Sequence, residues 1–237
     1  MITIDFDKLK LESGGYFLDI GCGEGRHMVE ACRQNNTHCM GGDYGYDNLV
    51  FTRNKLHFHE NIQDLNCQRW ALSTMDATGL PFKDEQFDAV VCSEVLEHIP
   101  DDDSAIDELV RITKPGKVLA VSVPRAWPER LCWALSDEYF NANMGHVRIY
   151  NKQQLIQRIQ ARGMTHFASH FAHSIHTPYW WLKCLEGPNR TDSLPVNLYH
   201  EFLVWDLMKQ PRLSRVLDKL LNPILGKSIV LYFRKDA

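Results

Sequence analysis

Short apolar runs alternate along this chain with longer segments whose apolar residues recur every three or four positions. Short runs are typical of strands buried on both faces, and the longer spacing is typical of amphipathic helices. The alternation predicts an α/β fold with a doubly wound, mostly parallel sheet. The expected strands lie at Tyr16 to Ile20, Cys39 to Asp43, Arg69 to Met75, Ala89 to Cys92 and Val118 to Val123.

Two of the expected helices have clear ends. One begins at Ser104 and is expected to stop before Lys114-Pro115-Gly116, because proline and glycine interrupt a helix. The other runs from Lys152 to Arg162, and Gly163 is its expected stop. The aspartates at positions 101 to 103 are expected to cap the first of these helices and to bind no metal.

A glycine-rich turn follows the first expected strand. Gly21, Gly23 and Gly25 let the backbone turn sharply and come close to a ligand. The ligand would lie at the carboxyl edge of the sheet, beside the start of the next helix. A dinucleotide-binding turn spaces its glycines G-x-G-x-x-G, and this chain has Arg26 at the third glycine position. The spacing therefore disfavours NAD.

Asp19 and the three glycines together resemble the first motif, D-x-G-x-G-x-G, of the class I S-adenosylmethionine-dependent methyltransferases. Further segments occur in the order of that family: Asp43 ends the second expected strand, Asp76-Ala77 follows the third, and the run from Ser93 to Ile99 follows the fourth. The last run resembles those of small-molecule methyltransferases, including the enzymes of quinone biosynthesis. The resemblance implies a Rossmann-like fold and S-adenosylmethionine as cofactor.

The resemblance also implies where the cofactor binds. Its methionine end is expected at Asp19, Gly21 and Gly23, and its adenine near Tyr44, Asp76 and Ala77. An acidic residue about 20 positions beyond the glycine turn is placed to bind ribose hydroxyls, and Asp43 has that position. The other expected cofactor-site residues are Cys22, Gly25, Arg26, Ser93, Glu94, Val95 and His98.

The resemblance adds two final strands, Met164 to Ala172 and Ser228 to Phe233, which would complete a seven-stranded sheet with its last strand antiparallel. The residues between them are too many for a structureless loop and show helical stripes, so they predict a helical insertion. We therefore divide the chain into a cofactor-binding core, residues 1–172 with 228–237, and a helical cap, residues 173–227. Because the first strand begins near the N-terminus, we expect this cap to close the pocket.

Histidines are the candidate catalytic bases, because their usual pKa suits proton transfer at neutral pH. His98 follows the fourth strand, although it could instead bond the backbone at a helix start. His146 lies in the loop Met144 to Arg148, and His176 lies in the first turn of the insertion. The series His166, His170, His173 and His176 lacks the carboxylates or cysteines that would complete a metal site.

Composition narrows the function further. The chain has 237 residues, 44% of them hydrophobic, which is enough for one domain with an elaboration. Its net charge of −4 disfavours a nucleic-acid partner. Seven cysteines without a C-x-x-C pair indicate neither disulfides nor zinc, and no metal is expected. No long apolar span and no signal peptide are found, so we expect a cytoplasmic protein.

The sequence thus predicts methyl transfer to a small-molecule acceptor. The aromatic run Tyr179-Trp180-Trp181 is either core or part of the wall of an apolar, lipid-like acceptor pocket. A nicotinamide-dependent oxidoreductase and a non-catalytic cofactor-binding partner protein are the alternatives.

A second apolar stripe, with basic residues on its flanks, lies near the end of the chain. It is either a lid packed over the core or a face that contacts an anionic membrane. Its apolar members are Leu213, Val216, Leu217, Leu220, Leu221, Ile224 and Leu225.

Overall fold

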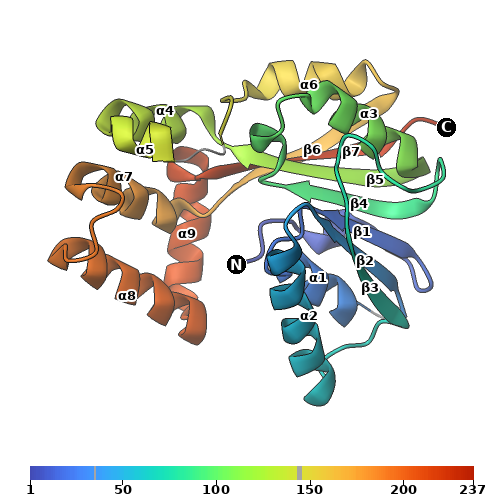
Figure 1. The fold of residues 1–237 in the computed structure, drawn as a ribbon, viewed down its shortest axis with the longest axis horizontal. Coiled ribbons are helices and arrows are strands. Elements are labelled where there is room, and N and C mark those ends of the chain that lie inside the picture. The colour runs from blue at the N-terminus through green and yellow to red at the C-terminus, as the bar shows by residue number, and fades with distance from the viewer. Residues whose placement is uncertain (35, 143–145) are drawn as a thin grey trace.

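The structure is a computed structural model that describes residues 1–34, 36–142 and 146–237. Seven strands form one sheet in the order β3-β2-β1-β4-β5-β7-β6 (Figure 1). Strand β7 runs antiparallel to both of its neighbours, and the other pairs are parallel, as expected. The strands are β1 (Tyr16–Ile20), β2 (His38–Asp43), β3 (Arg69–Thr74), β4 (Phe87–Ser93), β5 (Thr113–Pro124), β6 (Met164–Ala172) and β7 (Ser228–Lys235).

The register brings the ends of the central strands to one level. Ile20, the last residue of β1, pairs with Gly42 of β2 on one side and with Cys92 of β4 on the other. The glycine turn after β1 therefore lies beside Asp43 and Ser93, which end the two neighbouring strands. This edge of the sheet is where a parallel fold binds its ligand.

Alternate residues of each strand pack into two cores, one on each face of the sheet. Helices α3 (Asp102–Ile112) and α6 (Lys152–Gln160) cover one face, where Ile106 and Ile159 are fully buried. Helices α1 (Arg26–Arg33) and α2 (Tyr46–Asn61) cover the other, where Met28 and Leu56 are fully buried. Figure 1 shows the two pairs of helices on opposite sides of the sheet.

Two element boundaries differ from the sequence prediction. Helix α3 begins at Asp102, before Ser104, because the Asp101 carboxylate accepts a hydrogen bond from the Ser104 amide and caps the helix. The segment Lys114-Pro115-Gly116 lies inside β5, where Gly116 has a φ of 74°. Proline and glycine thus end the helix as expected, but the chain continues as strand without a separate turn.

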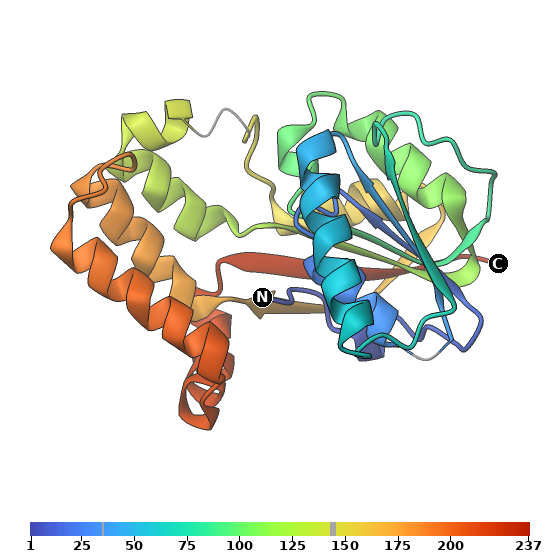
Figure 2. The ribbon, with the colours of Figure 1, turned by 60° about the horizontal axis from the view of Figure 1, so that its bottom comes forward.

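The insertion is helical, as expected. It contains a short 3-10 helix η3 (Ser174–His176), α7 (Thr177–Glu186), α8 (Leu194–Lys209) and α9 (Arg212–Leu225). Two helices that the sequence did not predict, α4 (Ala126–Leu135) and α5 (Asp137–Ala142), lie with them at one end of the sheet (Figure 2).

Buried side chains join these two sets of helices. Cys132 of α4, Tyr139 of α5 and Cys184 of α7 form one small apolar cluster. The helical layer is therefore larger than residues 173–227, because residues 126–142, which we had assigned to the core, pack with it.

Helix α9 packs against the rest of the protein through its polar side. The Asp218 carboxylate accepts hydrogen bonds from the Ser174 hydroxyl at 2.8 Å and from the Ile175 amide at 3.2 Å. The Asn222 side chain accepts from the Ser174 amide at 3.0 Å. The lid interpretation is wrong for the apolar stripe, because five of its members are exposed: Leu213, Val216, Leu217, Leu220 and Ile224.

Within the described ranges of the chain, no helix is both long enough and apolar enough to cross a bilayer.

Candidate functional site

A cavity of about 730 Å³ opens where the carboxyl ends of β1, β2 and β4 meet. Its volume lies within the usual range for small-molecule sites. The lining brings together most of the residues that the sequence assigned to a cofactor: Gly21, Gly23, Asp43, Tyr44, Asp76, Ala77, Glu94, Val95 and His98. Four segments far apart in the chain therefore meet at one place.

The glycine turn has the shape that a closely approaching ligand requires. Gly23 has a φ of 53°, and a Cβ added to it would meet no atom within 4 Å. Gly23 is one of the residues that line the cavity. Gly21 has a different reason to be glycine, because its Cβ would lie 2.2 Å from Val95 Cγ2. One glycine thus leaves room for a ligand, and the other leaves room for the neighbouring strand end.

Asp43 connects the turn to the second strand. Its carboxylate accepts hydrogen bonds from the backbone amides of Gly23 and Gly45, both at 2.8 Å, and from the Asn48 side chain at 3.0 Å. A carboxylate has about four acceptor positions, so it can still accept from a hydroxyl in the cavity. Asn48 lines the same cavity. Asn48 could not be identified from the sequence, because no motif marks it.

The opposite wall comes from the turn after β3. The Asp76 carboxylate accepts hydrogen bonds from the Thr78 amide at 2.9 Å and from the Thr78 hydroxyl at 2.8 Å. These two donors lower the pKa of Asp76. Ala77 is buried beside it, and Tyr44 is exposed at the rim. Asp76 is therefore an ionised, fixed acceptor at the cavity wall.

Asp19 is a buried carboxylate at the end of β1 that lacks a hydrogen-bond donor among the described residues. It is 1% exposed, and neither of its oxygens has a hydrogen-bond partner among the described residues. Burial raises the pKa of Asp19 to about 7. An ammonium group bound at the glycine turn would supply the missing positive charge, so this residue suits the methionine end of the expected cofactor.

The remaining expected cofactor residues lie behind the turn and do not line the cavity in the described part of the chain. Cys22 is buried, and Gly25 begins helix α1 with a φ of 76°. Arg26 donates a hydrogen bond to the Ser93 hydroxyl at 3.3 Å. These residues support the glycine turn and the end of β4.

The charge of the lining separates two classes of ligand. Four carboxylates line the cavity, Asp43, Asp76, Glu94 and Asp101, and no arginine or lysine does so among the described residues. Such a wall repels the pyrophosphate of a dinucleotide and attracts a cation. Asp101, which the sequence suggested only as a helix cap, also belongs to this wall.

A cluster of histidines and glutamates lies at the His98 side of the cavity. The rings of His98 and His146 are 4.8 Å apart. His146 Nδ1 lies 2.8 Å from Glu129 Oε1, and Glu97 Oε1 lies 4.0 Å from His98 Nε2. The structure thus brings two predicted catalytic histidines together and adds Glu129 from α4, which no sequence motif marks. Met144 and Gly145 of the same loop lie outside the described residues.

His176 lies apart from this cluster. It ends the short helix η3 of the insertion and is absent from the cavity lining among the described residues. Burial lowers the pKa of His176 to about 4. A histidine that stays neutral in the protein interior is better suited to packing than to acid–base chemistry at the cavity.

The cap also differs from its expected role. In the described part of the chain, residues between Ile20 and Asp101 line the cavity, and none of the insertion does so. The insertion instead borders a larger cavity of about 1080 Å³ together with the N-terminal segment and Arg26. The reason is that α9 packs against η3 and β6, away from the glycine turn.

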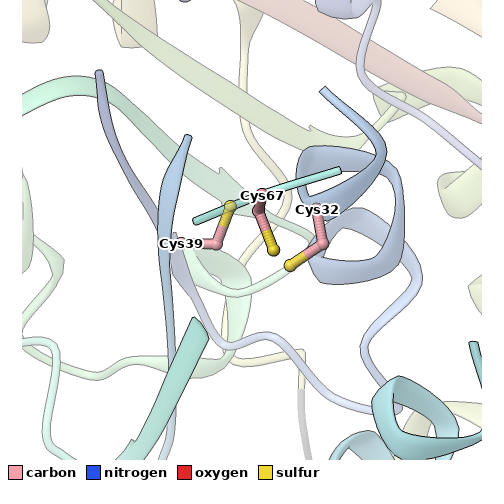
Figure 3. A group of neighbouring side chains, drawn as sticks. All are labelled: Cys32, Cys39 and Cys67. Atoms are coloured by element: carbon pink, nitrogen blue, oxygen red, sulfur yellow. The ribbon is translucent and has the colours of Figure 1, made fainter. Parts of the chain in front are cut away.

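Three cysteines that are distant in the sequence lie together at the opposite end of the sheet. Figure 3 shows Cys32, Cys39 and Cys67, whose sulfur atoms lie within 4.8 Å of one another. Cys32 and Cys39 are buried, and Cys67 is half-buried. The spacing of the cysteines in the sequence could not reveal this group, because its members come from helix α1, strand β2 and the segment before β3.

Comparison with known proteins agrees with the geometry. Residues 5–167 match the family model described as a methyltransferase domain. The chain belongs to this methyltransferase family. Its sheet, with the final strand antiparallel, is that of the class I members that the sequence resembled.

Curated and solved methyltransferases show how far the likeness extends. The ubiquinone biosynthesis O-methyltransferase of Aeromonas salmonicida is 32% identical over 171 residues, 68% of this chain and 69% of that protein. A putative methyltransferase from Bacillus halodurans is 18% identical, with a TM-score of 0.65 over 98% of this chain and 97% of the other. The chain spans about half the length of several curated relatives that it matches.

Proposed function

We propose that this methyltransferase transfers a methyl group from S-adenosylmethionine to a small organic acceptor. The observation that carries the proposal is the cavity at the glycine turn, which has four carboxylates and, among the described residues, neither arginine nor lysine. The donor carries a positive sulfonium and an ammonium group, which this wall favours. The same wall and the family membership speak against the nicotinamide-dependent alternative.

The cavity residues, with the buried Asp19 behind the glycine turn, divide into three parts in this proposal. Asp19, Gly21 and Gly23 take the methionine end, Asp43 accepts from the ribose hydroxyls, and Asp76 with Ala77 meets the adenine. The sulfonium then faces the side of the cavity formed by Glu94, Val95 and His98. Catalysis by alignment requires the acceptor atom to lie in line with the S–CH₃ bond, and ideal positioning is worth about 7–11 kcal/mol.

Calorimetry with S-adenosylmethionine tests the site. Gly23→Val should abolish detectable binding, because the side chain would project into the cavity from a residue with positive φ. Gly79→Ala is the matched control, because a Cβ there meets nothing within 4 Å and Gly79 does not line the cavity. NAD should bind to neither form. Undiminished affinity of Gly23→Val would refute the assignment.

We further propose that His98 and His146 serve the acceptor and not the cofactor. Alanine at His146 should lower kcat or raise KM for the acceptor, while the dissociation constant of S-adenosylmethionine stays near the wild-type value. His176→Ala, inside the insertion, should leave both constants near wild type. Loss of cofactor affinity in His146→Ala would contradict this division.

An apolar or lipid-like acceptor collected at an anionic membrane is the finer form of the proposal. Support comes from helix α9, where Leu213 is 81% exposed and Leu220 is 69% exposed. Arg212 and Lys219 are exposed on the same helix. Each such cation near an anionic surface contributes on the order of 1 kcal/mol, so attachment should be weak and sensitive to salt. We expect the protein to work in the cytoplasm.

Flotation with vesicles that contain phosphatidylglycerol tests this contact. The wild type should float at low salt and not at high salt, and Leu220→Glu should not float at either. Phe58→Glu changes another exposed apolar residue, in α2, and should behave as wild type. If the wild type does not float at low salt, the proposed membrane contact is wrong and a water-soluble acceptor is favoured.

A further inference from the structure

Three side chains with metal-binding atoms converge beside the methyl-donor cavity. One carboxylate oxygen of Glu97 and one ring nitrogen each of His98 and His146 lie within 4.8 Å of one another. Glu97 and His98 belong to the 3-10 helix η2 (Leu96–His98), and His146 comes from the distant loop before α6. The Val147 amide donates to the Glu97 carbonyl at 2.8 Å and holds that loop against η2.

Glu97 is the member whose environment favours a bound cation. Its side chain is 0% exposed, and neither carboxylate oxygen has a hydrogen-bond partner among the described residues. Two further carboxylates, Glu94 and Glu129, lie close enough to add negative charge at Glu97, and Lys227 offsets only part of it. A buried carboxylate is costly unless it is paired or bound to a metal.

Glu129 prepares His146 as a ligand. It is buried at the first turn of α4, and its Oε1 accepts from the Trp133 ring at 3.1 Å and lies 2.8 Å from His146 Nδ1. Donation from Nδ1–H to this carboxylate would leave Nε2 with a free lone pair. A histidine that donates one nitrogen to a carboxylate and offers the other to a metal is the usual arrangement in metalloproteins.

We propose that Glu97, His98 and His146 bind one divalent transition-metal ion at the acceptor side of the cavity. Two imidazoles and one carboxylate suit Zn²⁺, Fe²⁺ or Mn²⁺, whereas Mg²⁺ and Ca²⁺ prefer sites made wholly of oxygen. Three protein ligands leave a coordination position open, as in catalytic zinc sites. The proposal replaces the expectation from sequence that no metal is bound.

The open position gives the ion a role that rests on the proposed function. An acceptor hydroxyl bound there would lose its proton to water more readily, because the ion stabilises the oxygen anion. The oxygen then forms a bond to the methyl carbon, while the C–S bond breaks and its electron pair returns to sulfur. The ion keeps its oxidation state. His98 and His146 thus act as ligands, not as bases.

Zinc binding to the metal-stripped protein, measured by calorimetry without cofactor, tests the site. The wild type should bind Zn²⁺ at this site, and His98→Ala should bind it at least about 100-fold more weakly because a ligand is lost. Glu129→Gln should weaken binding about 10- to 100-fold, the usual effect of losing a partner of a ligand. His57→Ala, at an exposed histidine of α2, should behave as wild type.

The cysteine cluster is the competing zinc site, and Cys67→Ser separates the two. This variant should keep the ion that His98→Ala loses. Cobalt adds a spectroscopic test, because thiolate ligands give intense charge-transfer absorption and a site of nitrogen and oxygen does not. Zinc lost in Cys67→Ser and kept in His98→Ala would overturn the proposal, as would a wild type that binds no zinc.

The experiment is independent of the proposed function. Metal binding is read without a methyl donor, so it can succeed while methyl transfer fails. Absence of S-adenosylmethionine binding with intact zinc binding would count against the proposed function alone. Intact cofactor binding with no metal would count against the metal site alone.

Discussion

The central sheet is packed through apolar side chains, whereas helix α9 contacts the rest of the protein through polar ones. In the middle of β5, Leu119 and Val121 are fully buried between helices. In α9 the only buried residue is Ser214. The hydrogen bonds of this helix to η3 come from polar side chains, while most of the apolar stripe faces outward. An amphipathic pattern therefore shows that a helix has two faces, but it does not show which face meets the protein.

The difference follows from what each region packs against. The sheet offers an apolar surface on each face, so its helices bury apolar stripes. Helix α9 meets the first turn of η3 at Ser174 and Ile175, whose backbone amides need acceptors, and Asp218 and Asn222 supply them. A contact made by hydrogen bonds leaves the apolar side of α9 available for another surface.

Truncation of the sheet core should have the largest effect on stability. Leu119→Ala removes a fully buried side chain from the middle of β5. We expect the free energy of unfolding to fall by about 2–5 kcal/mol, because a cavity is left behind. Urea denaturation followed by circular dichroism measures it, and a loss below about 1 kcal/mol would mean that this core is poorly packed.

Asp19 tests whether the sheet edge tolerates a buried charge. The pKa of Asp19 is raised from 3.8 to about 7. Between these values the folded state holds a proton that the unfolded state lacks, so stability falls by about 1.4 kcal/mol for each unit by which pH rises. Asp19→Asn should remove this pH dependence. Its free energy of unfolding should therefore rise relative to that of the wild type as the pH increases to 7. Parallel stability profiles of the two proteins between pH 5 and 7 would contradict the buried charge.

Asp218 tests the polar contact of the cap. Asp218→Ala leaves the Ser174 hydroxyl and the Ile175 amide without their carboxylate acceptor. We expect the free energy of unfolding to fall by about 1–3 kcal/mol, which is the cost of leaving buried donors unsatisfied. Lys219→Ala, at the exposed neighbour, is the control. Equal stability of the two variants in thermal unfolding would show that the apolar side, and not the polar side, holds α9 in place.

The apolar stripe of α9 should contribute least. Leu220→Ala changes an exposed side chain, so the free energy of unfolding should move by no more than about 0.5 kcal/mol. The comparison with Leu119→Ala uses the same substitution in both regions. If Leu220→Ala at micromolar protein concentration lowers the free energy of unfolding as much as Leu119→Ala does, the stripe is covered in solution.

Much of the sheet could be predicted from the sequence, and the reason is local. The strand Tyr16 to Ile20 begins and ends where its apolar residues placed it, because burial of a strand requires a continuous apolar run. The bounds Met164 to Ala172, which the family resemblance implied, also match, although β6 is mostly half-buried. The glycine turn was found because it combines a strand end with an unusual spacing. Helices α4 and α5 were missed, since their apolar residues face other helices of the cap and do not form one regular stripe.

The acceptor side of the site could be predicted only in part. His98 and His146 were candidates because of their residue type, but their neighbour Glu129 has no sequence signature and reaches them from α4. The cysteine cluster was missed for the same reason. Spacing along the chain reveals a site made by one turn, whereas a site assembled from separate elements becomes visible only when the packing is known.

Strand β7 lies between β5 and β6, yet the chain makes it only after the whole insertion. During synthesis on the ribosome, β6 therefore waits beside an empty position while residues 173–227 emerge. Its amides and carbonyls are unpaired through that interval, as at any exposed sheet edge, which exposes the nascent chain to association with other strands. The first helices of the cap leave the ribosome before β7 and can fold first. The order of translation therefore places the insertion beside β6 while β6 still lacks its partner strand.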